Sequence, residues 1–146
     1  MADGVLIIGY GNPLRGDDSV GYQAAGRLQA LIDNPTIQIV AAHQLTPEMA
    51  EPISRAARVI FIDAAVGPTP GEISESRPSP RTSGSFTHHA TPEGLLAAAE
   101  ALYGRAAEAV LYTITGADFG YGTGLSPPVS RALDVVVATV LSSASS

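Results

Sequence analysis

The chain has 146 residues, the size of one ordinary domain, a net charge of −6 and no cysteine. The absence of cysteine excludes disulfides, thiolate nucleophiles and cysteine-held metals, and it suits a reducing cytoplasm. The eight basic residues are all arginines scattered along the chain, so we expect no nucleic-acid partner. No apolar run approaches the roughly 20 residues of a membrane-spanning helix, and the N-terminus lacks signal-peptide features. We therefore expect a cytoplasmic protein without a membrane partner.

Strand-like and helix-like segments alternate along the chain. Short apolar runs rich in β-branched residues predict buried strands, and a weaker alternation of apolar and polar residues predicts an edge strand. The buried strands are expected at residues 4–9, 37–41, 58–63 and 109–115, and the edge strand at 72–76.

Four helices are predicted by apolar residues that recur every three or four positions. The first opens at Asp17 and ends at Asn34-Pro35, and the last opens at Ser126. The other two open with Thr-Pro-Glu, at Thr46 and Thr91, where Thr is the N-cap and Pro the first helical residue. The second should end near residue 57, and the third carries a stripe of Leu95, Leu96, Ala99, Leu102 and Tyr103.

The alternation of strands and helices predicts one α/β domain over residues 1–146. Helices should cover both faces of a twisted, mostly parallel sheet of about five strands, which is a three-layer α/β/α sandwich. In such folds, ligands bind beyond the carboxyl ends of the strands.

The loop after the first strand ends in two acids, Asp17 and Asp18. It is glycine-rich, but Leu14 stands where a dinucleotide-binding fingerprint needs its third glycine, and the chain has no Walker lysine. In a structural interpretation Asp17 is the helix N-cap and Asp18 favours the helix dipole, worth about 0.3–1 kcal/mol. A functional interpretation is compatible with it, because one aspartate can cap while its neighbour points into the cleft.

Further polar residues follow other strands. Asp63 ends the strand 58–63, where a carboxylate is costly unless it is paired, hydrogen-bonded or bound to a cation; a satisfied loop aspartate is the alternative. The adjacent His88 and His89 precede the third helix. Near two carboxylates, an imidazole would complete a site suited to a first-row metal, although surface histidines are the alternative. His43, after the second strand, is a reserve candidate at the same edge.

Five motifs, in this order, resemble those of the hydrogenase maturation endopeptidase family. Residues 9–18 followed by Gly21 are similar to the family's opening signature, although Ser19 stands where glycine is common. The other matching segments are residues 44–48, residues 60–64, residues 87–88 with 95–96, and residues 116–119 through 124–127.

This resemblance implies an endopeptidase that removes a short C-terminal extension from the nickel-loaded large-subunit precursor of a nickel–iron hydrogenase. It places the family's metal-contacting residues on Asp18, Asp63 and His88; His88 is preferred to His89 by its spacing from Leu95-Leu96. We expect nickel to arrive with the substrate and zinc or cadmium to act as surrogates.

Asp17 is expected to position Asp18 or a water molecule in that reaction. Two alternatives stay open from the residues. One is an α/β metallohydrolase with its own permanent metal. The other is a nucleotide- or cofactor-binding module that uses the glycine-rich loop, but it would need an acid at the end of the second strand, where Ala41-Ala42-His43 stands.

Overall fold

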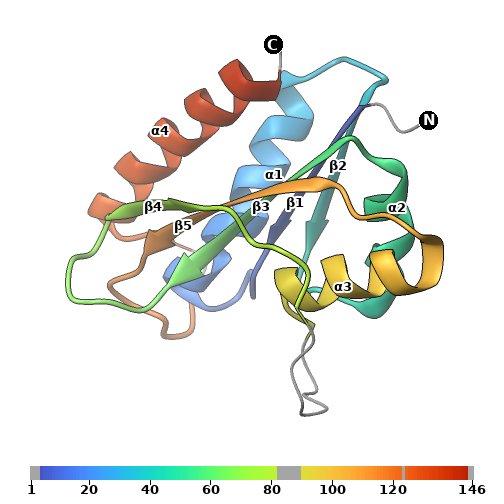
Figure 1. Ribbon diagram of the computed structural model, residues 1–146. Helices are drawn as coiled ribbons and strands as arrows, with labels where there is room; N and C mark the ends of the chain where they lie inside the picture. Colours follow the sequence, from blue (N-terminus) through green and yellow to red (C-terminus); the bar gives the residue numbers. More distant parts are fainter. Residues whose placement is uncertain (1–3, 82–89, 123, 145–146) are drawn as a thin grey trace.

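The computed structural model describes residues 4–81, 90–122 and 124–144. Within them, five strands form one sheet in the order β2-β1-β3-β5-β4 (Figure 1). Every neighbouring pair is parallel except β4 with β5, which is antiparallel. The predicted mostly parallel sheet with an edge strand is therefore confirmed. The strands are β1 (Val5–Tyr10), β2 (Ile37–Ala42), β3 (Arg58–Ala65), β4 (Ile73–Ser76) and β5 (Glu108–Thr115).

Helices cover both faces of this sheet. Figure 1 shows α1 and α4 on one side and α2 and α3 on the other. Successive strand residues alternate between the layers: Ile60 and Ile62 pack with α1 and α4, while Val59 and Phe61 pack with α2 and α3. The predicted three-layer α/β/α sandwich is confirmed. The helices are α1 (Val20–Leu31), α2 (Ala50–Arg55), α3 (Pro92–Tyr103) and α4 (Pro127–Ala144), with short 3₁₀ turns η1 (Gly16–Ser19) and η2 (Pro47–Met49).

The helix α3 begins as its sequence predicts. The Thr91 hydroxyl accepts a hydrogen bond from the Gly94 backbone N–H at 3.0 Å, which satisfies one free donor of the first turn. One part of the prediction is wrong: Leu102 and Tyr103 are 71% and 50% exposed, because the buried stripe of this helix ends at Ala99.

The first two predicted helices differ from the prediction, the first at its start and the second at its end. Residues 16–19 form the turn η1, and the α-helix begins only at Val20. The expectation that Asp17 is an N-cap is wrong, because its carboxylate is bonded to a distant loop described below. After η2, α2 ends at Arg55 rather than near residue 57, since Ala56 has extended backbone.

The helix α4 is amphipathic, as predicted. Its buried face includes Val129, Leu133, Val136 and Val140, whereas Asp134 is exposed. In the part of the chain that the structure describes, no helix has both the length and the apolar character needed to cross a membrane.

The start of α1 lies very close to the sheet. A Cβ atom on Gly21 would lie 2.2 Å from the carbonyl oxygen of Ile62 and 2.5 Å from that of Tyr10, so only glycine fits there. This close approach holds η1 beside the last residues of β1 and β3, where ligands bind in folds of this kind.

Candidate active site at the carboxyl ends of the strands

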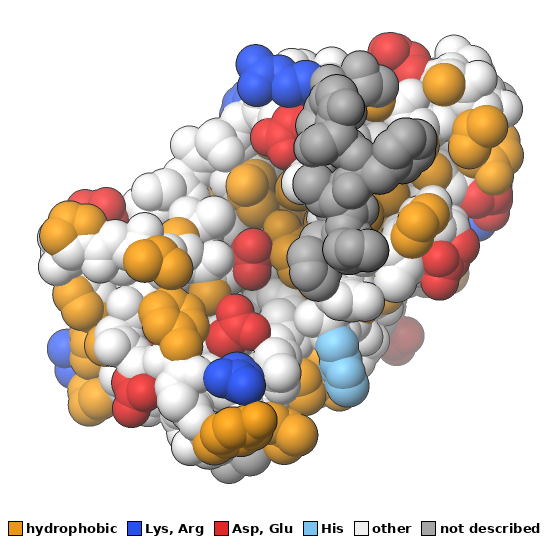
Figure 2. All heavy atoms as spheres, turned by 90° about the horizontal axis from the view of Figure 1, so that it is seen from below, with side chains coloured by type: hydrophobic (Ala, Val, Ile, Leu, Met, Phe, Trp, Pro, Cys, Tyr) orange, Lys and Arg blue, Asp and Glu red, His pale blue; other side chains and the backbone are white. Residues whose placement is uncertain are grey.

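The strand order reverses direction at β1. The chain passes from β1 to β2 on one side and then to β3 on the other, so the carboxyl ends of β1 and β3 flank a topological switch point. Helices that connect parallel strands diverge at such a point, which leaves an opening between them. Figure 2 looks onto this end of the molecule, and acidic side chains lie near the middle of the view.

Asp63 lies just beyond the pairing of β1 with β3. That pairing ends at Gly9 and Ile62, whereas β3 continues along β5, with Asp63 opposite Thr113. The carboxylate accepts hydrogen bonds from the backbone N–H of Ala64, at 2.7 Å, and from the Tyr10 hydroxyl. The strand therefore extends two residues further than predicted, and Asp63 has partners from both β1 and β3.

Burial raises the pKa of the Asp63 carboxyl to about 6, against a usual value of 3.8. The hydrogen bonds from Ala64 and Tyr10 favour the ionised form but do not offset the loss of water, and the charge of Asp18 raises the pKa further. Burial, together with the charge of Asp63, also raises the pKa of the Tyr10 hydroxyl far above its usual value, so Tyr10 stays a hydrogen-bond donor.

Asp18 is half-buried in the turn that follows β1. Its Oδ2 atom accepts a hydrogen bond from the Asn12 backbone N–H at 2.8 Å, and its own N–H donates to the Arg15 carbonyl at 2.9 Å. Gly11 makes this turn possible: its φ is +149°, and a Cβ there would lie 1.9 Å from the Asp18 carbonyl oxygen. The backbone of the loop therefore orients the Asp18 carboxylate.

The two carboxylates lie near enough for the charge of Asp18 to affect the ionisation of Asp63. Among the residues that the structure describes, neither forms an ion pair with an arginine or histidine. Two neighbouring carboxylates without a cationic partner repel each other, and a bound cation would remove that repulsion. The chemistry of the pair therefore suits a metal ion or a polar substrate group.

Asp17 has a different role from the one its sequence position suggests. Its side chain is fully buried, and its carboxylate accepts four hydrogen bonds. The donors are the backbone N–H groups of Ala117, Asp118 and Ser126 and the Ser126 hydroxyl, at 2.7–3.0 Å. Burial would raise the pKa of the Asp17 carboxyl, but these bonds outweigh it and hold the pKa below its usual value. Asp17 thus joins η1 to the loop after β5 and to the start of α4.

Backbone hydrogen bonds reinforce this connection. The N–H groups of Gly16 and Asp17 donate to the carbonyls of Gly122 and Asp118, both at 2.8 Å, and the Gly122 N–H donates to the Leu14 carbonyl at 2.9 Å. Sequence reasoning missed this contact, although the glycine-rich composition of residues 116–124 marked the loop as one that could approach another backbone closely.

The histidines divide into two groups. His88 and His89, the predicted third ligand and its neighbour, lie outside the described residues. His43 is exposed after β2 and packs edge-on against the Tyr22 ring, with the ring centroids 5.6 Å apart. The described residues contain no group of three histidine, aspartate or glutamate side chains that could hold a metal. Within them, the candidate site therefore consists of Asp18 and Asp63.

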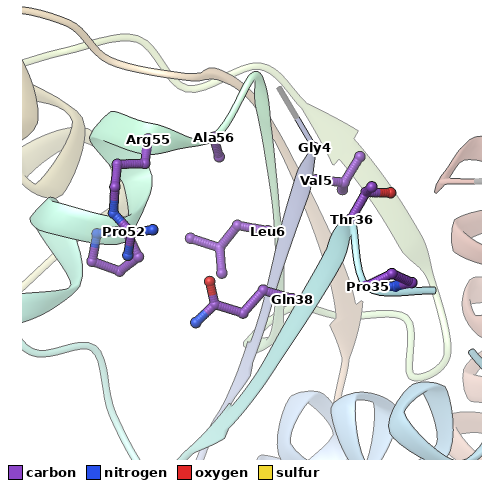
Figure 3. Close-up of a pocket in the computed structure, with 9 residues that line it drawn as sticks. All are labelled: Gly4, Val5, Leu6, Pro35, Thr36, Gln38, Pro52, Arg55 and Ala56. Atoms are coloured by element: carbon purple, nitrogen blue, oxygen red, sulfur yellow. The ribbon is translucent and has the colours of Figure 1, made fainter. Parts of the chain in front are cut away.

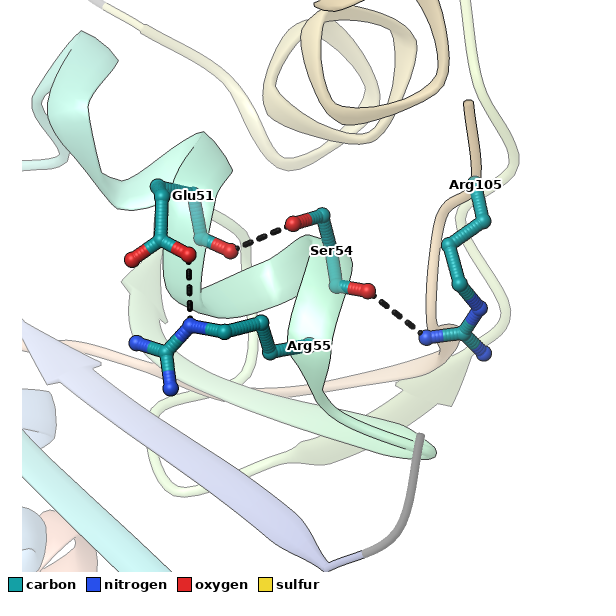
Figure 4. Close-up of polar contacts among 4 residues, drawn as sticks. All are labelled: Glu51, Ser54, Arg55 and Arg105. Carbon is teal, nitrogen blue, oxygen red and sulfur yellow. Dashed lines mark hydrogen bonds and ion pairs between the residues drawn. The ribbon is translucent and has the colours of Figure 1, made fainter. Parts of the chain in front are cut away.

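A hollow of about 250 Å³ lies at the opposite end of the sheet, beside the amino ends of β1 and β2. Figure 3 shows Thr36, Gln38 and Arg55 among its lining residues. The Arg55 guanidinium forms an ion pair with Glu51, and Arg105 donates to the Ser54 carbonyl at 2.9 Å (Figure 4). Arg55 and Arg105 at this end therefore have partners within the protein.

Comparison with family models finds no match, and no curated protein sequence matches the chain. Solved structures do match over nearly the whole chain. The [NiFe] hydrogenase maturation protease HycI from Thermococcus kodakarensis KOD1 has a TM-score of 0.80 at 21% identity, over 98% of this chain and 93% of that one.

Two further structures have the same fold. The hydrogenase maturating endopeptidase HybD from E. coli has a TM-score of 0.76 at 19% identity, over 96% of this chain and 91% of that one. The hydrogenase 2 maturation peptidase from Thaumarchaeota archaeon SCGC_AB-539-E09 has a TM-score of 0.71 at 24% identity, over 96% and 97%. At these identities the likeness establishes a shared fold.

Proposed function

We propose that this protein is an endopeptidase that removes a C-terminal extension from the nickel-loaded large-subunit precursor of a nickel–iron hydrogenase. The observation that carries the proposal is the pair of neighbouring carboxylates, Asp18 and Asp63, at the switch point of the sheet. Support comes from the ordered motifs of the sequence and from a fold shared with proteins named as hydrogenase maturation proteases. Because the chain lacks cysteine, we place the reaction in the cytoplasm.

In this proposal nickel is part of the substrate. Asp18 and Asp63 supply carboxylate oxygens, and His88 supplies the third ligand as an imidazole nitrogen. This mixed oxygen and nitrogen set suits a first-row divalent metal, and the repulsion between the carboxylates favours binding of a cation. Zinc or cadmium would occupy the same ligands as surrogates. Cleavage would then depend on prior insertion of nickel into the precursor.

The protein's own residues would hold this arrangement in place. Tyr10 and Ala64 direct hydrogen bonds at the Asp63 carboxylate, and the Asn12 N–H fixes that of Asp18. Asp17 acts as a positioning residue, because its four hydrogen bonds hold η1 in place. The metal would supply polarisation of the scissile carbonyl or activation of a water molecule.

The proposal is tested by incubating the full chain with candidate nickel-loaded large-subunit precursors and measuring their intact masses. We expect one precursor to lose a single C-terminal segment. If every candidate precursor from the same organism kept its full mass, the proposal would be wrong.

Metal analysis of the purified protein separates the proposal from a metallohydrolase with its own permanent metal. We expect no stoichiometric metal in the isolated protein, since the ion arrives with the substrate. One tightly held zinc ion per chain, required for hydrolysis, would favour the metallohydrolase.

A further inference from the structure

Two exposed apolar side chains lie on joined loops at the end of the sheet that carries Asp18 and Asp63. Leu14 is 58% exposed and Tyr121 is 82% exposed. They are more than 100 positions apart in the sequence, but the backbone hydrogen bond from Gly122 to Leu14 brings their loops into contact. We call Leu14, Arg15 and Tyr121 the rim surface.

Arg15 holds the aromatic ring of the rim surface. The centre of its guanidinium lies 4.4 Å from the centroid of the Tyr121 ring, and its Nη2 atom donates to the Tyr121 hydroxyl at 3.2 Å. The backbones below are tied by an isolated β-bridge between Arg15 and Gly122. An exposed aromatic side chain that is already held by such contacts loses little conformational entropy when another molecule packs on it.

Apolar burial does not explain the positions of Leu14 and Tyr121. Burial of apolar area stabilises a protein, and these two side chains leave most of their area in water. Tyrosine and arginine are the residues most enriched where protein partners make their strongest contacts, alongside tryptophan. The composition and the rigidity of the rim surface therefore both fit a docking contact.

The position of the rim surface determines which molecule would cover it. Asp18 is three residues after Arg15 and donates its N–H to the Arg15 carbonyl. A polypeptide whose scissile bond lies at Asp18 and Asp63 therefore has residues beside that bond close to the loop that carries Arg15. The precursor of the proposed function is therefore the occupant that this position favours.

We infer that the rim surface docks an apolar segment of the precursor next to its scissile bond, with Leu14 and the Tyr121 ring as the contacts and Arg15 as the residue that positions the ring. This inference rests on the proposed function. It assigns substrate recognition to three residues outside the acid pair, and it predicts that their loss weakens binding of the precursor more than it slows the chemical step.

The test is the steady-state processing of the precursor by Tyr121→Ala and Leu14→Asp. Each variant should raise KM on the order of 10-fold, which corresponds to about 1.4 kcal/mol, while kcat stays within a factor of two or so. Tyr121→Phe keeps the ring but loses the hydrogen bond from Arg15, so its KM should stay closer to the wild-type value than that of Tyr121→Ala. Thermal unfolding should change little in all three, because the altered side chains are exposed.

Matched controls come from exposed apolar residues on other faces of the molecule. Tyr103→Ala and Leu31→Asp remove a tyrosine that is 50% exposed and a leucine that is 58% exposed, and both should leave KM unchanged. The inference would be wrong if the control variants raised KM as much as the rim variants. It would also be wrong if Tyr121→Ala and Leu14→Asp left KM unchanged while the wild type processed the precursor. In both cases the proposed function would stand. If the wild-type protein processed no precursor, both the inference and the proposed function would be wrong.

Discussion

Charged side chains at the two ends of the central sheet differ in whether they have partners within the protein. At the amino ends of the strands, Arg55 pairs with Glu51, and Arg105 donates to the carbonyls of Ser54 and Ala56. At the carboxyl ends, Asp18 and Asp63 have no cationic partner among the described residues, although both are half-buried.

Helix direction accounts for the arginines but not for Asp63. Connecting helices run antiparallel to the strands, so the carboxyl end of α2 meets the amino ends of the strands. Arg55 lies in its last turn, and Arg105 satisfies carbonyls at its end, both of which are favourable. Asp63 lies within β3, and its hydrogen bonds from Ala64 and Tyr10 do not offset the cost of its burial. A charge that the fold does not stabilise is the expected mark of a functional site.

The largest contrast should appear in activity. Asp63→Ala and Asp18→Ala should each abolish processing of the nickel-loaded precursor, because each removes a carboxylate that the proposed mechanism uses directly. Glu51→Ala, at the amino end, should process the precursor at the wild-type rate. The measurement is the intact mass of the precursor after incubation, with circular dichroism to confirm that each variant is folded. Full activity of Asp63→Ala would contradict the assignment.

The next largest effect should be on stability, at Asp17. Removing its carboxylate leaves four donors without an acceptor in a buried place, so Asp17→Ala should lower the free energy of unfolding by about 3–5 kcal/mol. The exposed ion pair of Asp134 with Arg27 provides the control, and Asp134→Ala should cost less than about 1 kcal/mol. Urea unfolding of both variants checks the difference, and equal losses would contradict the structural role of Asp17.

In the metal-free protein, the contribution of Asp63 to the free energy of unfolding should depend on pH. Its pKa is raised to about 6 in the folded state, so the folded state binds more protons than the unfolded state between about pH 4 and pH 6. Stability due to this group therefore falls as pH rises through that range. Asp63→Asn should be more stable than the wild type by roughly 2–3 kcal/mol at pH 8 and by little at pH 4. A difference that is independent of pH would contradict the raised pKa.

The smallest effect should come from the amino end. Arg105→Ala loses two hydrogen bonds to the carbonyls at the end of α2 and should lower the free energy of unfolding by about 1–2 kcal/mol. It should leave the kinetics of processing unchanged, since it lies at the far end of the sheet. Altered KM or kcat would show that the two ends are not independent.

Local patterns predicted most of the fold. The apolar runs gave four of the strands, the weak alternation gave β4, and Thr91-Pro92 marked the start of α3. The errors in the predicted element boundaries come from tertiary contacts. β3 runs on to Ala65 because β5 pairs with it beyond the end of β1, and no local signal records that.

The candidate site was predicted less completely. Asp63 could be singled out because a carboxylate at the end of an apolar strand is costly there. Asp17 could not be assigned correctly, since the groups that bind its carboxylate lie about 100 residues later in the chain. The contact of Arg15 with Tyr121 could not be predicted for the same reason, because these two residues are also far apart in the sequence. His88 stays a prediction, as it lies outside the described residues.

The central claim is that the acid pair recognises nickel in the substrate, and one measurement tests it most directly. The same precursor is prepared with and without nickel, mixed with the wild-type protein, and followed by intact mass over time. We predict that only the nickel-loaded form loses its C-terminal segment. Cleavage of the nickel-free form at the same rate would contradict the claim.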